Sequence, residues 1–386
     1  MMFKTRRQTM DDRRQGWLRL FTVYGFVFSM MLSLNVYADE WKIAVPDYGW
    51  SFPQDHWARP GYKTEWWYFT GHLKSESGRA FGYQFTFFRV GLLPNKPDLD
   101  SGWAANNLIM GHAAIGDLET GQHYFSEVLY RETALLGGFG TYPDTLLAWS
   151  RGPVGTQDKW SLKWNGEAFD FNAVDAKKEM GFELRTQPKK PLIFQGPNGY
   201  SKKGAGESAA SQYYSFTRLA TEGSVTVGGE RFEVTGESWM DKEFGSNQLD
   251  INQAGWDWFS LQMDDGREVM LYVLRDKSQA VDYARGTVVS KEGEAQYLER
   301  EMFEIKVTDR WTSSQTKATY PAGWIVEVNG ETLIVQPEMN NQENRAKLVG
   351  TLFYWEGAVR VLKEGKKIGQ GYVELTGYGD GSVPGL

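Results

Sequence analysis

Short turn signals separate apolar segments along most of this 386-residue chain. Asn-Gly and Asp-Gly pairs tolerate positive φ at both central turn positions, so between two apolar runs they favour β-hairpins. Eight such signals occur: Ser77-Gly78, Thr120-Gly121, Asn165-Gly166, Gly228-Gly229, Asp265-Gly266, Glu292-Gly293, Asn329-Gly330 and Glu356-Gly357. Helical periodicity is weak, and we expect at most a short helix over Glu294–Phe303. Regular hairpins without βαβ spacing predict an all-β protein built from antiparallel barrels or sandwiches.

Several of the expected strands carry apolar residues on both faces. Side chains alternate along a strand, so residues two apart share a face. One such set is Phe81, Tyr83, Phe85 and Phe87; a second is Val269, Leu271 and Val273, with Met270, Tyr272 and Leu274 opposite. We interpret such strands as lining a core on one side and meeting a partner sheet or a ligand on the other.

A faint internal echo indicates two similar barrels. Residues 65–69 lead through a Gly-Arg turn to an apolar strand that ends at Arg89, and residues 256–259 do the same toward Arg275. Coincidence is the alternative, because the spacings differ by a few residues. If the echo is genuine, residues 39–240 form an N-terminal barrel domain and residues 241–386 a C-terminal one.

The first 38 residues have the pattern of an export signal. Basic residues precede an apolar run from Trp17 to Leu34, and Val36-Tyr37-Ala38 is a small-residue cleavage site. We therefore expect a signal peptide over residues 1–38 and a periplasmic or secreted protein. An uncleaved membrane anchor is the alternative, because the run is about as long as a bilayer span.

Composition excludes several kinds of chemistry. The chain has no cysteine, which removes disulfides, thiolate nucleophiles and Cys-based metal sites. Its four histidines all lie within residues 56–123, so a His-dependent mechanism must draw on that segment. A formal net charge of −7 without a basic tract argues against a nucleic-acid partner. The scan finds no nucleophile elbow, zincin helix, P-loop or dinucleotide fingerprint, so we predict neither a metal nor a cofactor.

Two segments place carboxylates among aromatic residues. In residues 63–72, Glu65, Trp66 and Tyr68 are candidate substrate-binding residues, because a carboxyl facing an apolar cavity has a raised pKa. In residues 236–245, Asp241 and Glu243 share one strand face and can divide acid and base roles. Core packing is the alternative for the first segment, and a turn or domain junction for the second.

Two further segments supply candidates. In residues 255–262, Trp256 and Trp258 share one face and Asp257 lies opposite; indole faces can stabilise a cationic intermediate, although ordinary core packing would use the same pattern. His112 lies among small apolar residues. It is either a hydrogen-bonded structural histidine or a functional residue that orients a hydroxyl or carries a proton.

At these residues the sequence resembles the AttH / carotenoid 1,2-hydratase (hydroxyneurosporene synthase, CrtC-like) family of exported lipocalin-like proteins. The matching stretches are residues 65–68, 112–117, 199–204, 213–219, 236–245 and 255–275. The resemblance implies two tandem lipocalin-like antiparallel β-barrels with an apolar pocket near their interface. It also implies hydration of isoprenoid double bonds or a hydrolase-like activity, and for AttH-type members an association with ABC-transport systems.

One departure from the family pattern bears on activity. Hydratase-like members tend to read Trp-x-Asp-His-x-Trp where this chain reads Trp239 to Phe244, with Lys242 in place of the His and Phe244 in place of the second Trp. The departure weakens the expectation of carotenoid hydration more than that of the fold or of an apolar ligand.

Two functional hypotheses follow. In the first, the protein is a hydratase- or hydrolase-like enzyme acting on an apolar, isoprenoid- or lipid-like ligand. Asp241 or Glu243 is then the acid, Tyr272 or His112 positions the water, and no cofactor is needed. The alternative is a non-catalytic periplasmic lipid- or isoprenoid-binding component that works with an ABC transporter permease. A purely structural module is a third, weaker reading.

Overall fold

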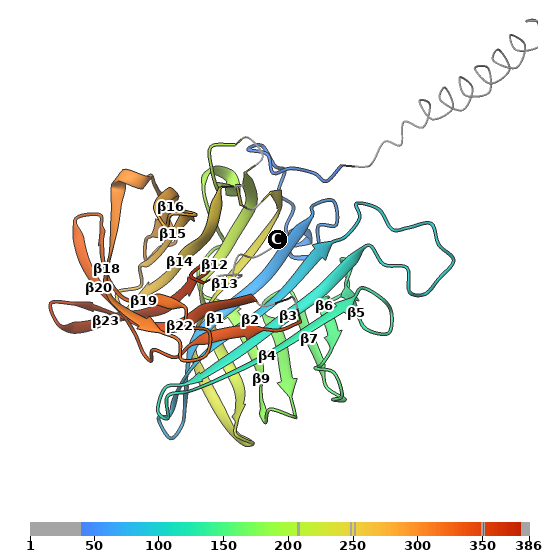
Figure 1. Cartoon of the computed structure of the whole chain (residues 1–386), viewed down its shortest axis with the longest axis horizontal. Coiled ribbons are helices and arrows are strands. Elements are labelled where there is room, and N and C mark those ends of the chain that lie inside the picture. The colour runs from blue at the N-terminus through green and yellow to red at the C-terminus, as the bar shows by residue number, and fades with distance from the viewer. Residues whose placement is uncertain are drawn as a thin grey trace, which may run out of the picture. The chain divides into compact units, whose positions relative to one another are not determined.

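The computed structural model describes residues 40–379 except 207, 208, 248, 251, 349 and 351. The predicted signal peptide, residues 1–38, lies outside these described residues. Within them, no helix is long and apolar enough to cross a membrane. The described chain is almost entirely antiparallel β-structure in two large sheets, as the hairpin signals predicted (Figure 1).

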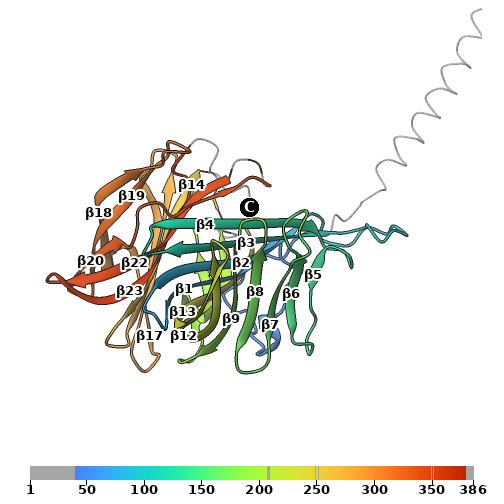
Figure 2. The ribbon, with the colours of Figure 1, turned by 90° about the horizontal axis from the view of Figure 1, so that it is seen from below.

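The first sheet curls into a nearly closed barrel. Its strands, in spatial order, are β4 (Gln122–Arg131), β3 (Asn107–Asp117), β2 (Ala80–Gly91), β1 (Thr64–Ser75), β13 (Glu230–Asn247), β12 (Ala210–Val227), β9 (Met180–Pro188), β8 (Phe169–Asp175), β7 (Lys159–Trp164), β6 (Leu146–Arg151) and β5 (Gly137–Phe139). The short strands β10 (Ile193–Phe194) and β11 (Tyr200–Lys202) also pair with β12. The edge strands β4 and β5 come into contact. In Figure 2, β1 to β4 cross over β6 to β9, which shows how the sheet folds back on itself.

The second sheet forms the other barrel. Its spatial order is β17 (Ala295–Leu298), β16 (Val281–Val289), β15 (Glu268–Asp276), β14 (Gln253–Met263), β23 (Lys366–Leu375), β22 (Leu352–Lys363), β20 (Glu331–Pro337), β19 (Thr319–Val328) and β18 (Phe303–Thr312), with β21 (Glu343–Ala346) on β22. The described helices are single 3-10 turns: η1 (Gln54–His56), η2 (Pro197–Gly199) and η3 (Arg300–Met302). The prediction of a short helix over Glu294–Phe303 is therefore mostly wrong, because β17 occupies the first half of this segment and only the single turn η3 lies in the second half.

Seven of the eight predicted turns join neighbouring strands, and one prediction is wrong. At Gly228-Gly229 and at Asn329-Gly330 both residues have positive φ, as a type I′ turn requires. Glu356-Gly357, by contrast, lies inside β22, where Glu356 pairs with Glu374 of β23. The turn between these two strands is at Glu364-Gly365, where both residues have positive φ.

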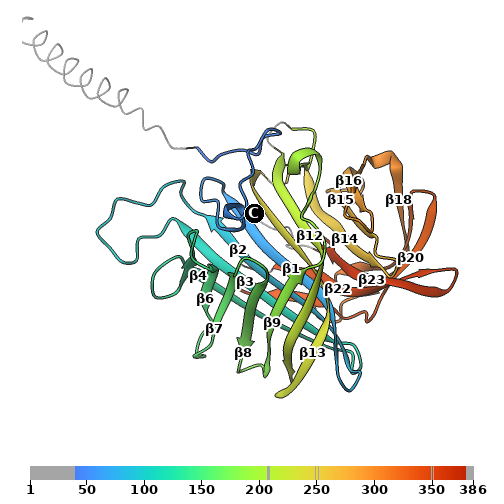
Figure 3. The same ribbon diagram turned by 180° about the vertical axis from the view of Figure 1, so that it is seen from behind.

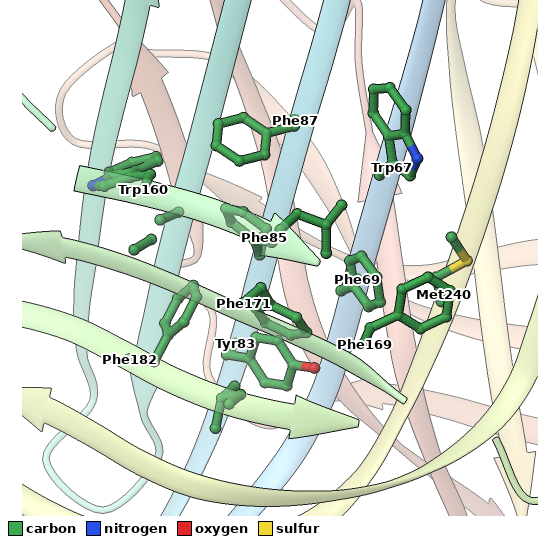
Figure 4. Close-up of a cluster of buried hydrophobic side chains, with 14 of the residues drawn as sticks. Trp67, Phe69, Tyr83, Phe85, Phe87, Trp160, Phe169, Phe171, Phe182 and Met240 are labelled. Carbon is green, nitrogen blue, oxygen red and sulfur yellow. The ribbon is translucent and has the colours of Figure 1, made fainter. Parts of the chain in front are cut away.

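Alternation along the strands builds three apolar clusters. The inward faces of the first sheet meet in a core of aromatic rings that includes Phe85, Phe171 and Trp160 (Figure 4). Val269, Leu271 and Val273 belong to the core of the second barrel, and Met270, Tyr272 and Leu274 on the opposite face of β15 belong to the third cluster. That third cluster also contains Tyr68, Tyr213 and Trp239 of the first sheet, so it lies between the barrels.

The two barrels pack through the outer faces of β1, β2 and β12 in the first sheet and of β14, β22 and β23 in the second. β1 contacts β23, β2 contacts β22 and β12 contacts β14. Figure 3 shows the second sheet lying beside this part of the first. Because these strands are buried on both faces, they read in the sequence as strands with two apolar sides.

Each barrel contains a buried carboxylate–arginine pair at the position of the internal echo. Arg89 binds Glu65 in the first barrel, and Arg275 Nε lies 2.9 Å from Asp257 Oδ1 in the second. Both arginines also donate to backbone carbonyl oxygens. Each pair ties one strand to the end of the next one. Residues 240 and 241, where the echo divides the chain, both lie in β13, which belongs whole to the first sheet.

Candidate functional site

A cavity of about 120 Å³ lies between the two barrels. Its wall is mainly aromatic and aliphatic, and its polar groups include four carboxyls. The lining residues include Trp66, Tyr68, Gln84, Phe88, Met110, His112, Lys203, Tyr213, Asp241, Glu243, Leu249, Trp256, Trp258, Tyr272, Leu274, Leu352, Tyr354, Glu356 and Glu374. A larger groove of about 780 Å³ crosses the first sheet, but exposed charged residues such as Lys163, Glu183 and Glu233 line it. The interface cavity is the better candidate, because ligand sites are concave and mostly apolar with a few placed polar groups.

Eight of the ten predicted site residues line this cavity: Trp66, Tyr68, His112, Asp241, Glu243, Trp256, Trp258 and Tyr272. The other two, Glu65 and Asp257, are absent from its wall. Each is next in sequence to a lining tryptophan, so strand alternation turns its side chain toward the interior of its own barrel. There they form the ion pairs with Arg89 and Arg275 described above.

Asp241 is a buried carboxyl held by neutral donors. Trp239 Nε1 donates to its Oδ1 at 2.7 Å, Ser215 donates to the same oxygen, and Tyr213 donates to Oδ2 at 2.8 Å. Burial raises the pKa of Asp241 to about 7, although these hydrogen bonds oppose the rise. A carboxyl with such a pKa is partly protonated at neutral pH and can act as a general acid.

Glu243 lies two residues further along β13, on the same face, and is paired with a cation. Lys203 Nζ lies 2.8 Å from Glu243 Oε1, and Ser211 also donates to that oxygen. The same ammonium lies 4.5 Å from the ring centre of Tyr272. Tyr272 donates its hydroxyl to the backbone oxygen of Lys202 at 2.6 Å. Asp241 and Glu243 therefore differ, since among the described residues Glu243 has a counter-charge and Asp241 has none.

Glu356 and Glu374 are cavity residues that the sequence reasoning missed. They face each other across β22 and β23, Tyr68 donates its hydroxyl to Glu356, and Trp256 donates to Glu374. Burial and the neighbouring Glu374 raise the pKa of Glu356 well above its usual range. Burial, together with Asp241 and Glu243, raises the pKa of Glu374 to about 7. In each strand a single acidic residue among apolar ones is the sequence signal that could have indicated a cavity carboxyl. For Glu356 this signal is masked, because Glu356-Gly357 is typical of a turn.

His112 contributes a neutral imidazole to the cavity. Its Nδ1 lies 2.7 Å from the Tyr354 hydroxyl, and burial lowers the pKa of His112 to about 3. Within the described residues its Nε2 has no hydrogen-bond partner, and neither does the Oε1 of nearby Gln84. His112 thus offers an unused polar atom at a cavity wall.

The Lys242 and Phe244 departures from the family pattern face away from the cavity. Lys242 is buried inside the first barrel, where its ammonium binds Glu65 and lies 3.6 Å from the ring centre of Trp67. Burial would raise the pKa of Glu65, but the charges of Lys242 and Arg89 outweigh it and lower that pKa. The position that matches the family's aspartate, Asp241, points into the cavity. The departures therefore alter the barrel interior and leave the cavity wall intact.

Metal ligation has no candidate site in the described part of the chain, because no group of three or more His, Asp or Glu side chains is placed to hold an ion. The class defined by the fold and the site is thus a double lipocalin-like barrel with an acid-lined apolar cavity between its halves.

Comparison with known proteins identifies the family. The chain belongs to the AttH-like family, whose profile matches residues 43–378. A crystal structure of a candidate AttH protein from Nitrosomonas europaea is 31% identical, covers 87% of this chain and 99% of its own, and superimposes with a TM-score of 0.77. Kievitone hydratase from Nectria haematococca shares the fold at 13% identity, with a TM-score of 0.61 over 88% of this chain and 96% of its own. No curated protein matches the sequence. The family resemblance inferred from the sequence is confirmed.

Proposed function

We propose that this protein is a hydratase-like enzyme that adds water to a carbon–carbon double bond of an apolar, isoprenoid- or lipid-like ligand in the interface cavity. The observation that carries the proposal is a group of buried carboxyls, led by Asp241, set in an aromatic wall. Hydration of an alkene needs a proton delivered to carbon and a cation shielded until water attacks. The name of the structural neighbour kievitone hydratase agrees with this chemistry.

The size of the cavity limits what it encloses. An engineered apolar cavity of about 150 Å³ holds one benzene molecule, so about 120 Å³ suits a group of similar size, such as one prenyl end group. Trp66, Phe88 and Leu352 are only partly buried, so a longer ligand could extend past them. The ligand would then be held by its end, with the double bond beside the carboxyls.

Asp241 is the proposed acid. Its proton goes to the less substituted alkene carbon, the π electrons form the new C–H bond, and positive charge is left on the neighbouring carbon. Tyr68, Trp256 and Trp258 line the same cavity as Asp241, and aromatic faces attract cations. Water adds from the side of Tyr272 or His112, which offer a hydroxyl and a neutral imidazole.

The test uses the purified protein with the acyclic carotenoid lycopene and the short prenyl alcohol geraniol. Gain of one water by mass supports the proposal, and loss of this gain in an Asp241→Asn/Glu243→Gln double variant supports the assignment of the acid. Glu343→Gln is the matched control, because Glu343 is a buried glutamate outside the cavity, bonded to Ser313 and Thr316. Unchanged turnover in the double variant would refute these roles.

A ligand carrier that works with an ABC transporter permease is the second candidate, favoured by the apolar wall of the same cavity. Lipid that remains bound in native mass spectrometry, without any hydrated product, would support the carrier instead. We also propose that residues 1–38 direct export. The N-terminal sequence of protein recovered from the periplasm should then begin at Asp39, and recovery only from the cytoplasm would contradict export.

A further inference from the structure

Two carboxyls stand side by side in the cavity without a counter-charge. Glu356 on β22 and Glu374 on β23 are cross-strand partners, and the Cβ atoms of such pairs lie about 4.5–5.5 Å apart. Both side chains line the cavity. Among the described residues, neither takes part in a salt bridge, unlike Glu243, which binds Lys203.

The groups that face this pair are neutral or acidic. Tyr68 on β1 and Trp256 on β14 donate hydrogen bonds to it. Other titratable groups that act on it are Asp241 and Glu243 on β13, Tyr354 on β22 and Tyr372 on β23. Lys203 is the cation among the described residues of the cavity wall, and its ammonium is already held by Glu243.

Two adjacent carboxyls in such surroundings cannot both ionise easily. Like charges close together in a low dielectric raise one pKa strongly, and the two groups then titrate as a pair. Burial is the first cause of the raised pKa of both residues, and their mutual repulsion adds to it for Glu356. The pair therefore retains a proton near neutral pH, and a nearby positive charge would favour its release.

We propose that Glu356 and Glu374 share one proton in the ligand-free protein and form the site that holds positive charge on the ligand. The chemical class that fits is an apolar body bearing a cationic head, with the head beside the pair and against the faces of Tyr68, Trp256 and Trp258. A compound with a quaternary ammonium group should bind there and displace the shared proton.

This inference rests on the proposed function, because in hydration the positive charge belongs to the carbocation formed after proton transfer from Asp241. When water attacks, a C–O bond forms and the oxygen must lose one proton. The ionised member of the Glu356–Glu374 pair accepts that proton, and exchange with solvent returns one proton to Asp241. The overall step is alkene plus water giving alcohol, with no oxidant or reductant.

The test is calorimetric titration of the full chain with octyltrimethylammonium and with octanol at pH 7.5. The ammonium head has a fixed charge, so any proton released comes from the protein, and two buffers with different ionisation enthalpies count it. We expect release of up to about one proton per ammonium ligand and none with octanol.

Variants separate the pair from the rest of the cavity. In Glu356→Gln, Glu374 keeps a pKa of about 7 and is mostly ionised at pH 7.5, so proton release on ammonium binding should be much smaller than in the unaltered protein. Glu356→Gln/Glu374→Gln should weaken ammonium binding about tenfold or more while octanol binding stays. The control Glu343→Gln should behave as the unaltered protein. The inference alone is overturned if the ammonium compound binds without proton release, or if the double variant binds it as tightly as the unaltered protein does. If octanol also fails to bind, the proposed function is overturned together with the inference.

Discussion

Asp241→Asn should stabilise the protein strongly at pH 8 and by much less at pH 5. The pKa of Asp241 rises from its ordinary value of 3.8 to about 7 on folding. At pH 5 the native Asp241 is protonated and similar in shape and charge to asparagine, but the unfolded residue is already ionised, so the aspartate still costs roughly 1.6 kcal/mol there. Above pH 7 it is a buried anion, so its ionised form destabilises the folded state. The contribution of this group to stability therefore falls as the pH rises between 4 and 7.

The size of the effect follows from the same numbers. Each pKa unit corresponds to about 1.4 kcal/mol, so a rise from 3.8 to about 7 amounts to about 4 kcal/mol at pH 8. The amide preserves the local bonds, because its oxygen can accept from Trp239 and Ser215 while its NH2 group meets the Tyr213 hydroxyl, which can accept. The variant should gain much of this 4 kcal/mol and lose turnover, as expected where an active site costs stability.

Urea unfolding of both proteins at pH 5 and pH 8 measures the effect. The matched control is Asp117→Asn, where the sign is opposite. Burial would raise the pKa of Asp117, but hydrogen bonds from Arg79 and Thr120 outweigh it and lower that pKa. Its ionised form stabilises the fold, so this variant should be less stable than the unaltered protein at both pH values, which lie above the ordinary pKa of 3.8. A stability difference for Asp241→Asn that is the same at both pH values would refute the reasoning.

Three further results are expected. Glu65→Gln should lower the free energy of unfolding, measured in urea, by about 3–5 kcal/mol, because it leaves Lys242 and Arg89 without their shared buried counter-charge. Octanol binding should persist in the folded fraction, and its loss would place Glu65 at the ligand. Lys242→His/Phe244→Trp, which restores the family pattern, should leave octanol and ammonium affinities unchanged, because neither side chain lines the cavity: Lys242 binds Glu65, and the Phe244 ring packs against Tyr48, Trp50 and Tyr62. Trp258→Leu should weaken ammonium binding by about 0.5–2 kcal/mol and octanol binding less; equal losses for both ligands would argue against a role for the indole face.

The strand alternation of the site could be predicted from the sequence. Asp241 and Glu243 lie on one face of β13 with Lys242 on the other, and Trp256 and Trp258 are likewise opposed to Asp257. These placements follow from the period of two, which any extended strand imposes. The sequence does not reveal which of the two faces meets the cavity, which is why it predicts a ligand site for Glu65 as well as for Trp66.

Glu356 shows where local signals fail. A Glu-Gly pair between apolar runs is typical of a turn, yet here it lies within a strand that pairs with β21 on one side and β23 on the other. The actual turn, Glu364-Gly365, has the same two residue types. Only the long-range register distinguishes the two pairs, because pairing with distant strands overrides the local preference.

The acidity of the site depends on both barrels at once. The interiors of the barrels are filled by rings such as Trp67 and Trp355, so the space for a ligand lies where the outer faces meet. Asp241 comes from the first barrel, whereas Glu356 and Glu374 come from the second. Each barrel covers the other's carboxyls and excludes water from them, and burial is the first cause of the raised pKa in all three. Separated barrels would expose these groups to solvent and return their pKa values toward the ordinary range, so the packing of the two sheets is itself what makes these carboxyls usable as acids near neutral pH.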